Sequence, residues 1–504
     1  MGPTVKLIAY TAKPFDVAVA SAKTCYSPRV VLPEEVNDGL RERIGASIWE
    51  SGHHTPFQHA TFTFGLENVS RHLVWSFLHA HPYYNSDQNS QRYVTLTEAK
   101  AHRPASLDAF PQLGRAYDDA VAAAWNAYAD LAGALKGKSA KLLAGIGKVK
   151  GLSQKQLDSE AEKKAIEAAR YVLPIAAYTS LYHTVSGLTL MRYARMASEC
   201  DCPTEAALLV SRMLDEVAKV DPAWQKFVAV TPALPLSASH PGYDAAAAFA
   251  EEFDAELDGR NTKLVSFDEN GEDLVASGVR EALGKTRAAL PDDDAIGLAV
   301  NPEKSDVLAG TLNCSPHSPI LRALNLASYS FKTRLSHVTD SQNQRHRTTP
   351  AVRPLLSATH SREPDFVAPK IISSDSGLNT AFLEAMRVSW EAKNALAEGG
   401  VAHQDAAYIL PNATAVRITE TGRLIDWMHK WRMRTCFTAQ EEIGGLALEQ
   451  LSQASQVHPR LLKYAGPPCF FRKGAVREGS PCPEGPRWCG IDVWRAFPNV
   501  KRPF

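Results

Sequence analysis

Residues 170–174 read Arg-Tyr-Val-Leu-Pro, and residues 407–411 read Ala-Tyr-Ile-Leu-Pro. A second echo joins the strand-like run at residues 5–10 (VKLIAY) to residues 262–267 (TKLVSF), and each run precedes a helical pattern. Self-similarity on this scale is the mark of a repeated structural unit. The sequence therefore predicts two tandem copies of one unit in a single chain.

Weaker similarities between the halves support the repeat, and the composition of the chain indicates its boundary. Ser70 begins a stretch that is echoed from Ser336, and residues 53–56 (HHTP) are echoed by residues 316–319 (PHSP). The offsets between matching segments range from 237 to 266 residues, so the loops must differ in length. An Ala-rich helical run followed by a polar Asp-Gly-Arg-Asn stretch marks the junction near residue 258. The predicted units are residues 1–258, residues 259–463, and a Pro-, Gly- and Cys-rich tail at residues 464–504.

The composition excludes several classes of protein. The chain has 504 residues, of which 45% are hydrophobic and 22% are charged, so it is not intrinsically disordered. Lys and Arg number 55, as do Asp and Glu, and this balance argues against a protein that coats nucleic acid or binds a membrane surface. The sequence shows neither a signal-peptide pattern nor an apolar run long enough to span a bilayer. Eight dispersed cysteines indicate reduced thiols, and we expect a cytoplasmic protein.

Helical patterns cover much of both halves. Long helices are predicted at residues 118–135, 160–171, 205–217, 379–397 and 421–434. In the last of these, Arg423 and Arg432 are nine residues apart, which puts them on opposite faces of a helix. We therefore expect these two arginines to serve different partners.

Two polar runs are candidates for an anion site. Residues 342–347 read Gln-Asn-Gln-Arg-His-Arg, and neighbouring cations of this kind repel one another unless an anion gathers them. Residues 85–93 combine amide, hydroxyl and guanidinium donors in one predicted loop ahead of a strand-like run at residues 93–96. By themselves, the two runs are also typical of a solvated surface patch and a polar turn.

The order of these runs resembles the flavin-dependent thymidylate synthases. In the first half, the resemblance rests on residues 53–64 (HHTPFQHATFTF), Ser70-Arg71, residues 90–93 (SQRY) and residues 170–174. In the second half, it rests on Ser336-His337, Gln342, residues 345–347 (RHR), Leu410-Pro411, residues 421–423 (TGR), Arg432 and residues 439–443 (AQEEI). The resemblance implies an α/β (α+β) fold in which each unit has a mainly antiparallel sheet with flanking helices.

Each half departs from the family pattern where the other half keeps it. The first half has His79-Ala80-His81 in place of Arg-His-Arg, Ser186-Gly187-Leu188 in place of Asn-x-Arg, and Ala197 in place of a later arginine. The second half lacks Ser-x-Arg and has Ala407 where the first half has Arg170. Family sites are built between subunits of a homotetramer, so we expect one composite site per chain.

The resemblance assigns a role to each candidate residue. Deoxyuridine monophosphate (dUMP) would be held by Gln342, Arg345, Ser90, Gln91, Arg92, Arg170 and Arg432. Arg432 would be the catalytic residue, its guanidinium stabilising negative charge on the uracil ring. FAD would contact His53, Thr55, Gln58, Arg345, His346, Arg347 and Arg423, although Gln58 replaces a family Glu and Thr421 a family Asn.

These roles imply an activity and an assembly. The implied reaction is flavin-dependent methylation of dUMP to dTMP, with NADPH and methylenetetrahydrofolate as co-substrates. A homodimer would stand in for the family tetramer. Two alternatives stay open, namely a related enzyme that transfers a hydroxymethyl group to dUMP and a non-catalytic protein that binds a nucleotide or FAD.

A histidine pair and the cysteines of the tail suggest metal or thiol chemistry as alternatives to this interpretation. His79-x-His81 on a strand would point two imidazoles to one side, but apart from Glu67 and Asp87 no Cys, Asp or Glu accompanies them at ligand spacing. Cys469, Cys482 and Cys489 could bind zinc with Cys436 or His458, yet paired Cys-x-x-Cys spacing is missing. The environment of Cys469 also faintly resembles the nucleophile region of the cysteine-using thymidylate synthases. We therefore expect structural thiols and no metal.

Overall fold

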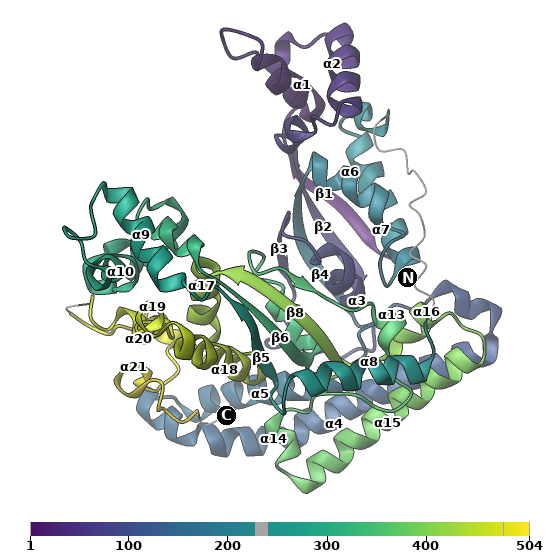
Figure 1. Ribbon diagram of the computed structural model, residues 1–504. Helices are drawn as coiled ribbons and strands as arrows, with labels where there is room; N and C mark the ends of the chain where they lie inside the picture. The colour runs from purple at the N-terminus through teal and green to yellow at the C-terminus, as the bar shows by residue number, and fades with distance from the viewer. Residues whose placement is uncertain (1, 227–239, 477, 503–504) are drawn as a thin grey trace.

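Two four-stranded antiparallel sheets with the same strand order form the centre of the computed structural model (Figure 1). The structure describes residues 2–226, 240–476 and 478–502. The first sheet has the order β1-β2-β4-β3 and the second has the order β5-β6-β8-β7. The strands are β1 (Thr4–Tyr10), β2 (Thr61–Ser70), β3 (Asn85–Gln88), β4 (Tyr178–Ser186), β5 (Thr262–Phe267), β6 (Ser328–Ser336), β7 (Ala351–Val352) and β8 (Ala415–Arg423). The expected α/β fold of two similar units is confirmed.

Alternating side chains explain why each sheet has one buried face. In β6, Tyr329, Phe331 and Leu335 are buried, whereas Lys332 and Arg334 between them are partly exposed. A period of two is what a strand with one face against a core requires. On that face, α7 (Pro203–Ala218) packs against β1 and α18 (Glu441–Val457) packs against β5.

The strand registers fix how the two copies correspond. Ser70 pairs with Tyr178 in the first sheet, and Ser336 pairs with Ala415 in the second. The equivalent strands β4 and β8 therefore differ by 237 residues, the offset already seen between Arg170 and Ala407. Corresponding positions can be read directly from this register.

Long helices lie beneath the two sheets (Figure 1). The helix α4 (Pro111–Lys150) packs along α5 (Gln154–Ala169) and α15 (Ser376–Glu398), so elements of both halves share one base. The other helices of eight or more residues are α1 (Pro14–Thr24), α2 (Asp38–Glu50), α6 (Gly187–Met196), α8 (Tyr243–Glu256), α9 (Gly271–Leu283), α10 (Asp292–Val300) and α17 (Leu424–Arg434). Within the described residues, none of the helices combines the length and apolar character needed to cross a bilayer. The unit boundaries at residues 258 and 463 stay predictions.

The two RYVLP-like segments meet at the junction of the halves. The Ile175 amide donates to the Leu410 carbonyl at 2.8 Å, and the Asn412 amide donates to the Leu173 carbonyl at 2.8 Å. Because both bonds pair equivalent segments in opposite directions, the halves are related by an approximate twofold axis here. One hydrophobic core runs through this junction and includes residues of both halves.

A matching pair of buried carboxylates strengthens the junction. Glu205 accepts from the Ser70 hydroxyl at 2.6 Å and from the Tyr408 hydroxyl of the other half at 2.7 Å. Glu442 accepts from the Ser336 hydroxyl at 2.7 Å and from the Tyr171 hydroxyl at 2.6 Å. Each carboxylate thus links its own sheet to the opposite half.

Three local predictions were wrong. The helix expected at residues 421–434 begins at Leu424, because Thr421 to Arg423 continue β8 and pair with β6. Residues 85–88 form the edge strand β3 rather than a loop, and residues 93–96 are not a strand. His79 and His81 also lie in a turn, so the strand geometry assumed for a metal pair is not present.

Candidate functional site

A cavity of about 580 Å³ lies between the two halves. Its volume falls within the range of about 300 to 1,000 Å³ that is usual for small-molecule sites. The lining comprises Arg71, Gln88, Asn89, Ser90, Gln91, Arg92, Tyr93 and Arg170 from the first half, and Val338, Ser341, Gln342, Arg345, His346, Asn412, His429, Met433 and Arg434 from the second. The structure therefore brings together seven of the predicted site residues, Ser90, Gln91, Arg92, Arg170, Gln342, Arg345 and His346.

Arg92 is held in place by both halves. Its Nε forms an ion pair with Glu167, and its Nη2 donates to the Thr438 carbonyl at 2.9 Å. Burial raises the pKa of Glu167, but the charges of Lys164, Arg92 and Arg170 outweigh this effect and lower the pKa to about 2. Glu167 therefore stays ionised and fixes the guanidinium of Arg92 at the cavity wall.

Arg170 and Arg71 are the most deeply placed cations. The Arg170 side chain is almost fully buried at 4% exposure, and its Nη2 has no hydrogen-bond partner. The Arg71 Nε is likewise buried without a partner, while its Nη2 donates to the Asn89 carbonyl at 2.9 Å. Burial and the nearby Arg170 charge lower the pKa of Arg71 to about 9. Both side chains would gain from an anionic ligand, since an unpaired buried donor is costly.

The second half supplies the opposite wall from α12 (His337–Asn343) and the turn that follows it. Arg345 is partly exposed, and its Nη2 lies 3.3 Å from Asp87. His346 Nε2 accepts from Arg434 Nε at 2.7 Å, and Arg434 Nη2 donates to the Gln342 carbonyl at 2.8 Å. Burial, with the nearby Arg434 charge, holds the pKa of His346 well below its usual value, so this imidazole is neutral.

The cavity has an excess of positive charge. Five guanidinium groups line it, namely Arg71, Arg92, Arg170, Arg345 and Arg434. Glu167 and the exposed Asp87 are the carboxylates that pair with them among the described residues. Burial and the charges of Arg92 and Arg345 lower the pKa of Arg434 to about 10. A phosphate, which arginine forks bind in a bidentate manner, would relieve this repulsion.

Two amide side chains add one free hydrogen-bond donor and one free acceptor to the cavity. Gln91 Nε2 and Gln342 Oε1 are buried and have no partner in the structure. The Gln91 Oε1 already accepts from Asn412 Nδ2 at 3.2 Å, so the orientation of this amide is set by the second half. A free donor and a free acceptor in one cavity suit a ligand that carries carbonyl and N–H groups.

Arg432 lies outside the cavity, contrary to expectation. Its guanidinium stacks 3.9 Å from the centre of the Phe471 ring and lines a separate small pocket with His429. Arg434 occupies the cavity instead, because residues two apart on α17 differ by about 200° around the helix. The repeat contained the signal for this, since the 237-residue register places Arg434, and not Arg432, opposite Ala197.

The residues expected to contact FAD fall into separate places. His53, Thr55 and Gln58 lie on the exposed edge of the turn η2 (Thr55–Gln58), which buried Phe57 anchors. This turn precedes β2, whereas Arg71 follows it, and ten residues of strand span about 33 Å. Within one chain, the η2 group therefore does not reach the cavity.

The remaining flavin candidates lie closer to the cavity or at the end of a strand. Arg347 donates to the Tyr84 carbonyl and to Asn85 Oδ1, and its guanidinium lies 5.2 Å from the centre of the Tyr84 ring. Arg423 is exposed at the end of β8. The donors are of types that suit a dinucleotide, but within one chain the structure does not bring them together with the η2 group.

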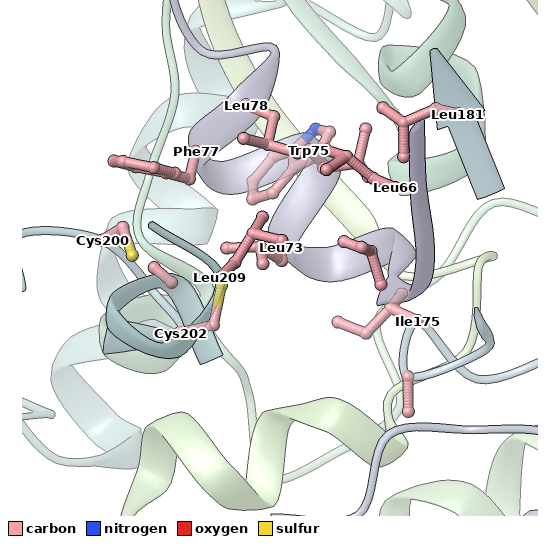
Figure 2. Close-up of a cluster of buried hydrophobic side chains, with 14 of the residues drawn as sticks. Leu66, Leu73, Trp75, Phe77, Leu78, Ile175, Leu181, Cys200, Cys202 and Leu209 are labelled. Atoms are coloured by element: carbon pink, nitrogen blue, oxygen red, sulfur yellow. The ribbon is translucent and has the colours of Figure 1, made fainter. Parts of the chain in front are cut away.

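The equivalent position on the other side of the junction is filled. Trp75 occupies the place of Ser341, Leu356 that of Gln91, and Ala407 that of Arg170. These three replacements are all buried. Figure 2 shows Trp75 lying among Leu66, Leu73 and Leu78. Apolar side chains thus fill the position that is equivalent to the polar cavity.

An internal ion pair completes this filled region. Arg353 binds Asp340 through Nε at 2.6 Å and through Nη2 at 3.1 Å. The Trp75 indole donates to the same carboxylate at 2.8 Å. The charge on Arg353 is therefore neutralised by the protein, whereas Arg71, Arg170 and Arg434 in the cavity have no ion-pair partner among the described residues.

Several lining residues were not assigned a role from the sequence. In the sequence, Arg71 stands out only as part of a Ser-Arg pair, and Asn412 directly follows the repeated Leu-Pro. No sequence pattern indicates Glu167, because its importance comes from contacts with Arg92 and Lys164 that only the fold creates.

Comparison with known proteins agrees with this arrangement of two copies. The chain matches the family "Thymidylate synthase complementing protein" over residues 6–223 and again over residues 263–460. It is 34% identical over 230 residues to the flavin-dependent thymidylate synthase of Clostridium tetani, which covers 45% of this chain and 87% of that protein. It is 27% identical over 221 residues to the enzyme of Saccharolobus solfataricus, covering 43% and 81% of the two chains.

Among solved structures, the UMP/dUMP methylase PolB from Streptomyces cacaoi bound with 5-Br dUMP is similar at 21% identity and a TM-score of 0.33, with 45% of this chain and 93% of that chain covered. The two family matches coincide with the two sheets and together cover most of the sequence. The chain therefore belongs to the thymidylate synthase complementing protein family, the flavin-dependent thymidylate synthases, with two copies of the family unit in one polypeptide.

Proposed function

We propose that the protein methylates dUMP to dTMP in a flavin-dependent reaction, using one composite site per chain. The observation that carries the proposal is the cavity between the halves, in which five guanidinium groups meet and buried polar atoms lack partners. A nucleoside monophosphate offers both a dianionic group and a base edge. It would satisfy the arginines and the two free amide atoms together.

The chain's own residues would bind and polarise the nucleotide. Arg92, Arg170 and Arg345 would hold the phosphate with Ser90, and Gln91 and Gln342 would meet polar edges of the nucleotide. Arg434, rather than Arg432, would stabilise negative charge on the uracil ring through its guanidinium as C5 becomes nucleophilic. The carboxylate of Glu167 keeps Arg92 in position before the substrate binds.

FAD would be held across two chains. The exposed η2 residues His53, Thr55 and Gln58 of one chain would approach Arg345, His346, Arg347 and Arg423 of the other. When bound, the cofactor supplies the hydride that completes the methyl group, with NADPH and methylenetetrahydrofolate as co-substrates. Two chains would thus take the place of a four-subunit assembly.

An exposed apolar sheet face supports this dimer. Ile8, Tyr10 and Tyr182 are between 43% and 57% exposed on the first sheet. Tyr182 pairs with Gly65 across the sheet, and the side chain of Ile8 lies over the same glycine, so both residues lie beside Gly65. Contiguous apolar surface of this kind is typical of a protein interface.

Two experiments separate this proposal from its alternatives. Purified protein should show a flavin absorbance band that responds to titration with dUMP, and turnover should release the C5 hydrogen of dUMP and yield dTMP. A hydroxymethylated product would identify the related enzyme, which the cavity geometry also accommodates. Protein that binds neither FAD nor dUMP would contradict the proposal.

A further inference from the structure

Four of the eight cysteines gather around one small cavity beside the nucleotide site. Cys436, Cys469, Cys482 and Cys489 all line this cavity, whose volume is about 10 Å³. All four are free thiols, and Cys469 is buried while the other three are partly buried. The remaining cysteines, Cys25, Cys200, Cys202 and Cys314, are not part of this lining.

The segment that carries three of these thiols has little else to hold it together. Its own core consists of Phe437, Cys469 and Val493, with a few partly buried apolar neighbours. The regular elements around it are short, namely α20 (Pro468–Arg472), η11 (Gly485–Arg487) and α21 (Val493–Ala496). Segments with so small a core usually depend on a disulfide or a metal for a fixed structure.

We infer that Cys436, Cys469, Cys482 and Cys489 bind one structural zinc ion. Four thiolates are a ligand set that a structural Zn²⁺ prefers, with Zn–S bonds of about 2.3 Å. The cavity has room for one ion, but among these four described cysteines no three sulfur atoms lie within 4.8 Å of one another. Metal binding would therefore draw the sulfur atoms inward around the ion. The match to the family ends at residue 460, so three of the four proposed ligands lie outside the repeated unit and Cys436 lies within it.

Cations near the thiols suit the charge of such a site. Four thiolates and one Zn²⁺ carry a net charge of −2. Arg472 acts on Cys482 electrostatically and donates from Nη1 to the Pro481 carbonyl at 3.0 Å. The Arg502 guanidinium lies 5.8 Å from the centre of the Phe437 ring, next to Cys436 in the chain.

The zinc ion would also support the wall of the nucleotide cavity. Thr438, two residues after Cys436, accepts the Arg92 hydrogen bond through its carbonyl at 2.9 Å. Arg502, close to the end of the tail, donates to the Phe437 and Ala439 carbonyls on either side of it. Fixing Cys436 to the tail would hold this turn against Arg92.

A histidine cluster elsewhere is less suited to a metal ion. Among the described residues, His240, His360 and His403 bring their ligand atoms within 4.8 Å of one another. However, His360 Nε2 already lies 2.9 Å from His403 Nδ1, and His240 Nε2 contacts the His360 carbonyl at 3.0 Å. The buried Lys393 nearby acts on His360 and would repel a cation. Beside the cysteines, by contrast, the positive charge of Arg472 favours the anionic form of Cys482.

The metal content of the purified full-length chain tests the inference without reference to catalysis. Mass spectrometry of the elements should find about one zinc per chain. Cys482→Ser and Cys489→Ser should each lower the zinc affinity by about tenfold or more, since each removes a ligand. Cys314→Ser is the matched control and should keep the metal.

A second measurement covers the case in which a variant does not fold. Stepwise blocking of thiols in the wild-type protein should release zinc in proportion to the modification of these four cysteines, and cobalt(II) in place of zinc should give the visible bands of a tetrahedral thiolate site. Zinc-free protein, iron with inorganic sulfide, or disulfides among these cysteines would overturn the inference.

Discussion

The two copies of the repeated unit share a scaffold but not a site. Both keep the strand register, and both keep a buried carboxylate, Glu205 or Glu442, that accepts from a serine of its own sheet and a tyrosine of the other half. These bonds hold the halves together, so losing either would destabilise the whole chain. The cavity residues carry no such constraint, and one set has been replaced.

The replacements remove a positive charge and put apolar side chains where the cavity has polar ones. Where the cavity has Ser341 and Arg434, the filled position has Trp75 and Ala197. Where the cavity holds five arginines and two paired carboxylates, the filled position pairs Arg353 with Asp340. One copy of the site has become part of the core, and the predictions below test that contrast from its largest expected effect to its smallest.

The largest effect is expected on stability, from opening the filled position. Trp75→Ala should lower the free energy of unfolding by about 4 kcal/mol, because it leaves a cavity and removes the indole bond to Asp340. Tyr83→Ala is the control, since this neighbouring aromatic side chain is 59% exposed and should change stability by less than about 1 kcal/mol. Thermal or denaturant unfolding measures both. A loss below about 1 kcal/mol for Trp75→Ala would show that the position is not well packed.

Catalysis should distinguish two arginines of α17. Arg434→Ala should lower turnover of dUMP by about 10² to 10³, the usual result of removing a group that stabilises charge in the transition state. Arg432→Ala should change turnover by less than about threefold, because this side chain stacks on Phe471 outside the cavity. The opposite ranking would restore the role first expected for Arg432.

A pH-dependent effect is expected from Glu167, whose equivalent in the second copy is Gln404. The pKa of Glu167 is lowered to about 2 from an ordinary value of 4.5. The resulting stabilisation, about 3 kcal/mol, is complete above pH 4.5 and is lost as the pH falls through 2. The stability difference between wild type and Glu167→Gln should therefore be constant from pH 7 to 4.5 and shrink below.

Glu162→Gln on the same helix is the control for that series. Its carboxylate is about half exposed in a surface ion pair with Lys136, so little stability and little pH dependence should be lost. A stability gap for Glu167→Gln that grows on acidification would contradict the assignment.

The smallest effect in this series is expected on substrate binding. Arg170→Ala should weaken dUMP binding by about 30-fold, the loss of a hydrogen bond to a charged group. Arg387→Ala, on the exposed face of α15, should leave the dissociation constant unchanged. Titration calorimetry compares the two variants, and equal affinities would exclude Arg170 from the site.

The repeat made the fold and much of the cavity predictable. Once residues 170–174 and 407–411 are aligned, the register places Arg92, Arg170 and Arg345 around one junction, where the structure has them. The same register also places Arg434 opposite Ala197, although family spacing alone had favoured Arg432. The local repeat was thus a better guide than the resemblance at this position.

Other features depend on the folded chain and were not predictable. The role of Glu167 arises from burial beside three cations, and the edge strand β3 forms because polar residues 85–88 pair with β4. The separation of η2 from the cavity follows from the length of β2. The four clustered cysteines have no paired spacing in the sequence. They line one cavity only because the tail folds back onto Cys436.

The number of dUMP molecules bound per chain tests the central claim most directly. Titration calorimetry of the purified full-length protein should give one dUMP per chain, with binding weakened by Arg170→Ala and unchanged in stoichiometry by Trp75→Ala. Two molecules per chain, or a single molecule whose affinity does not depend on Arg170, would contradict the account.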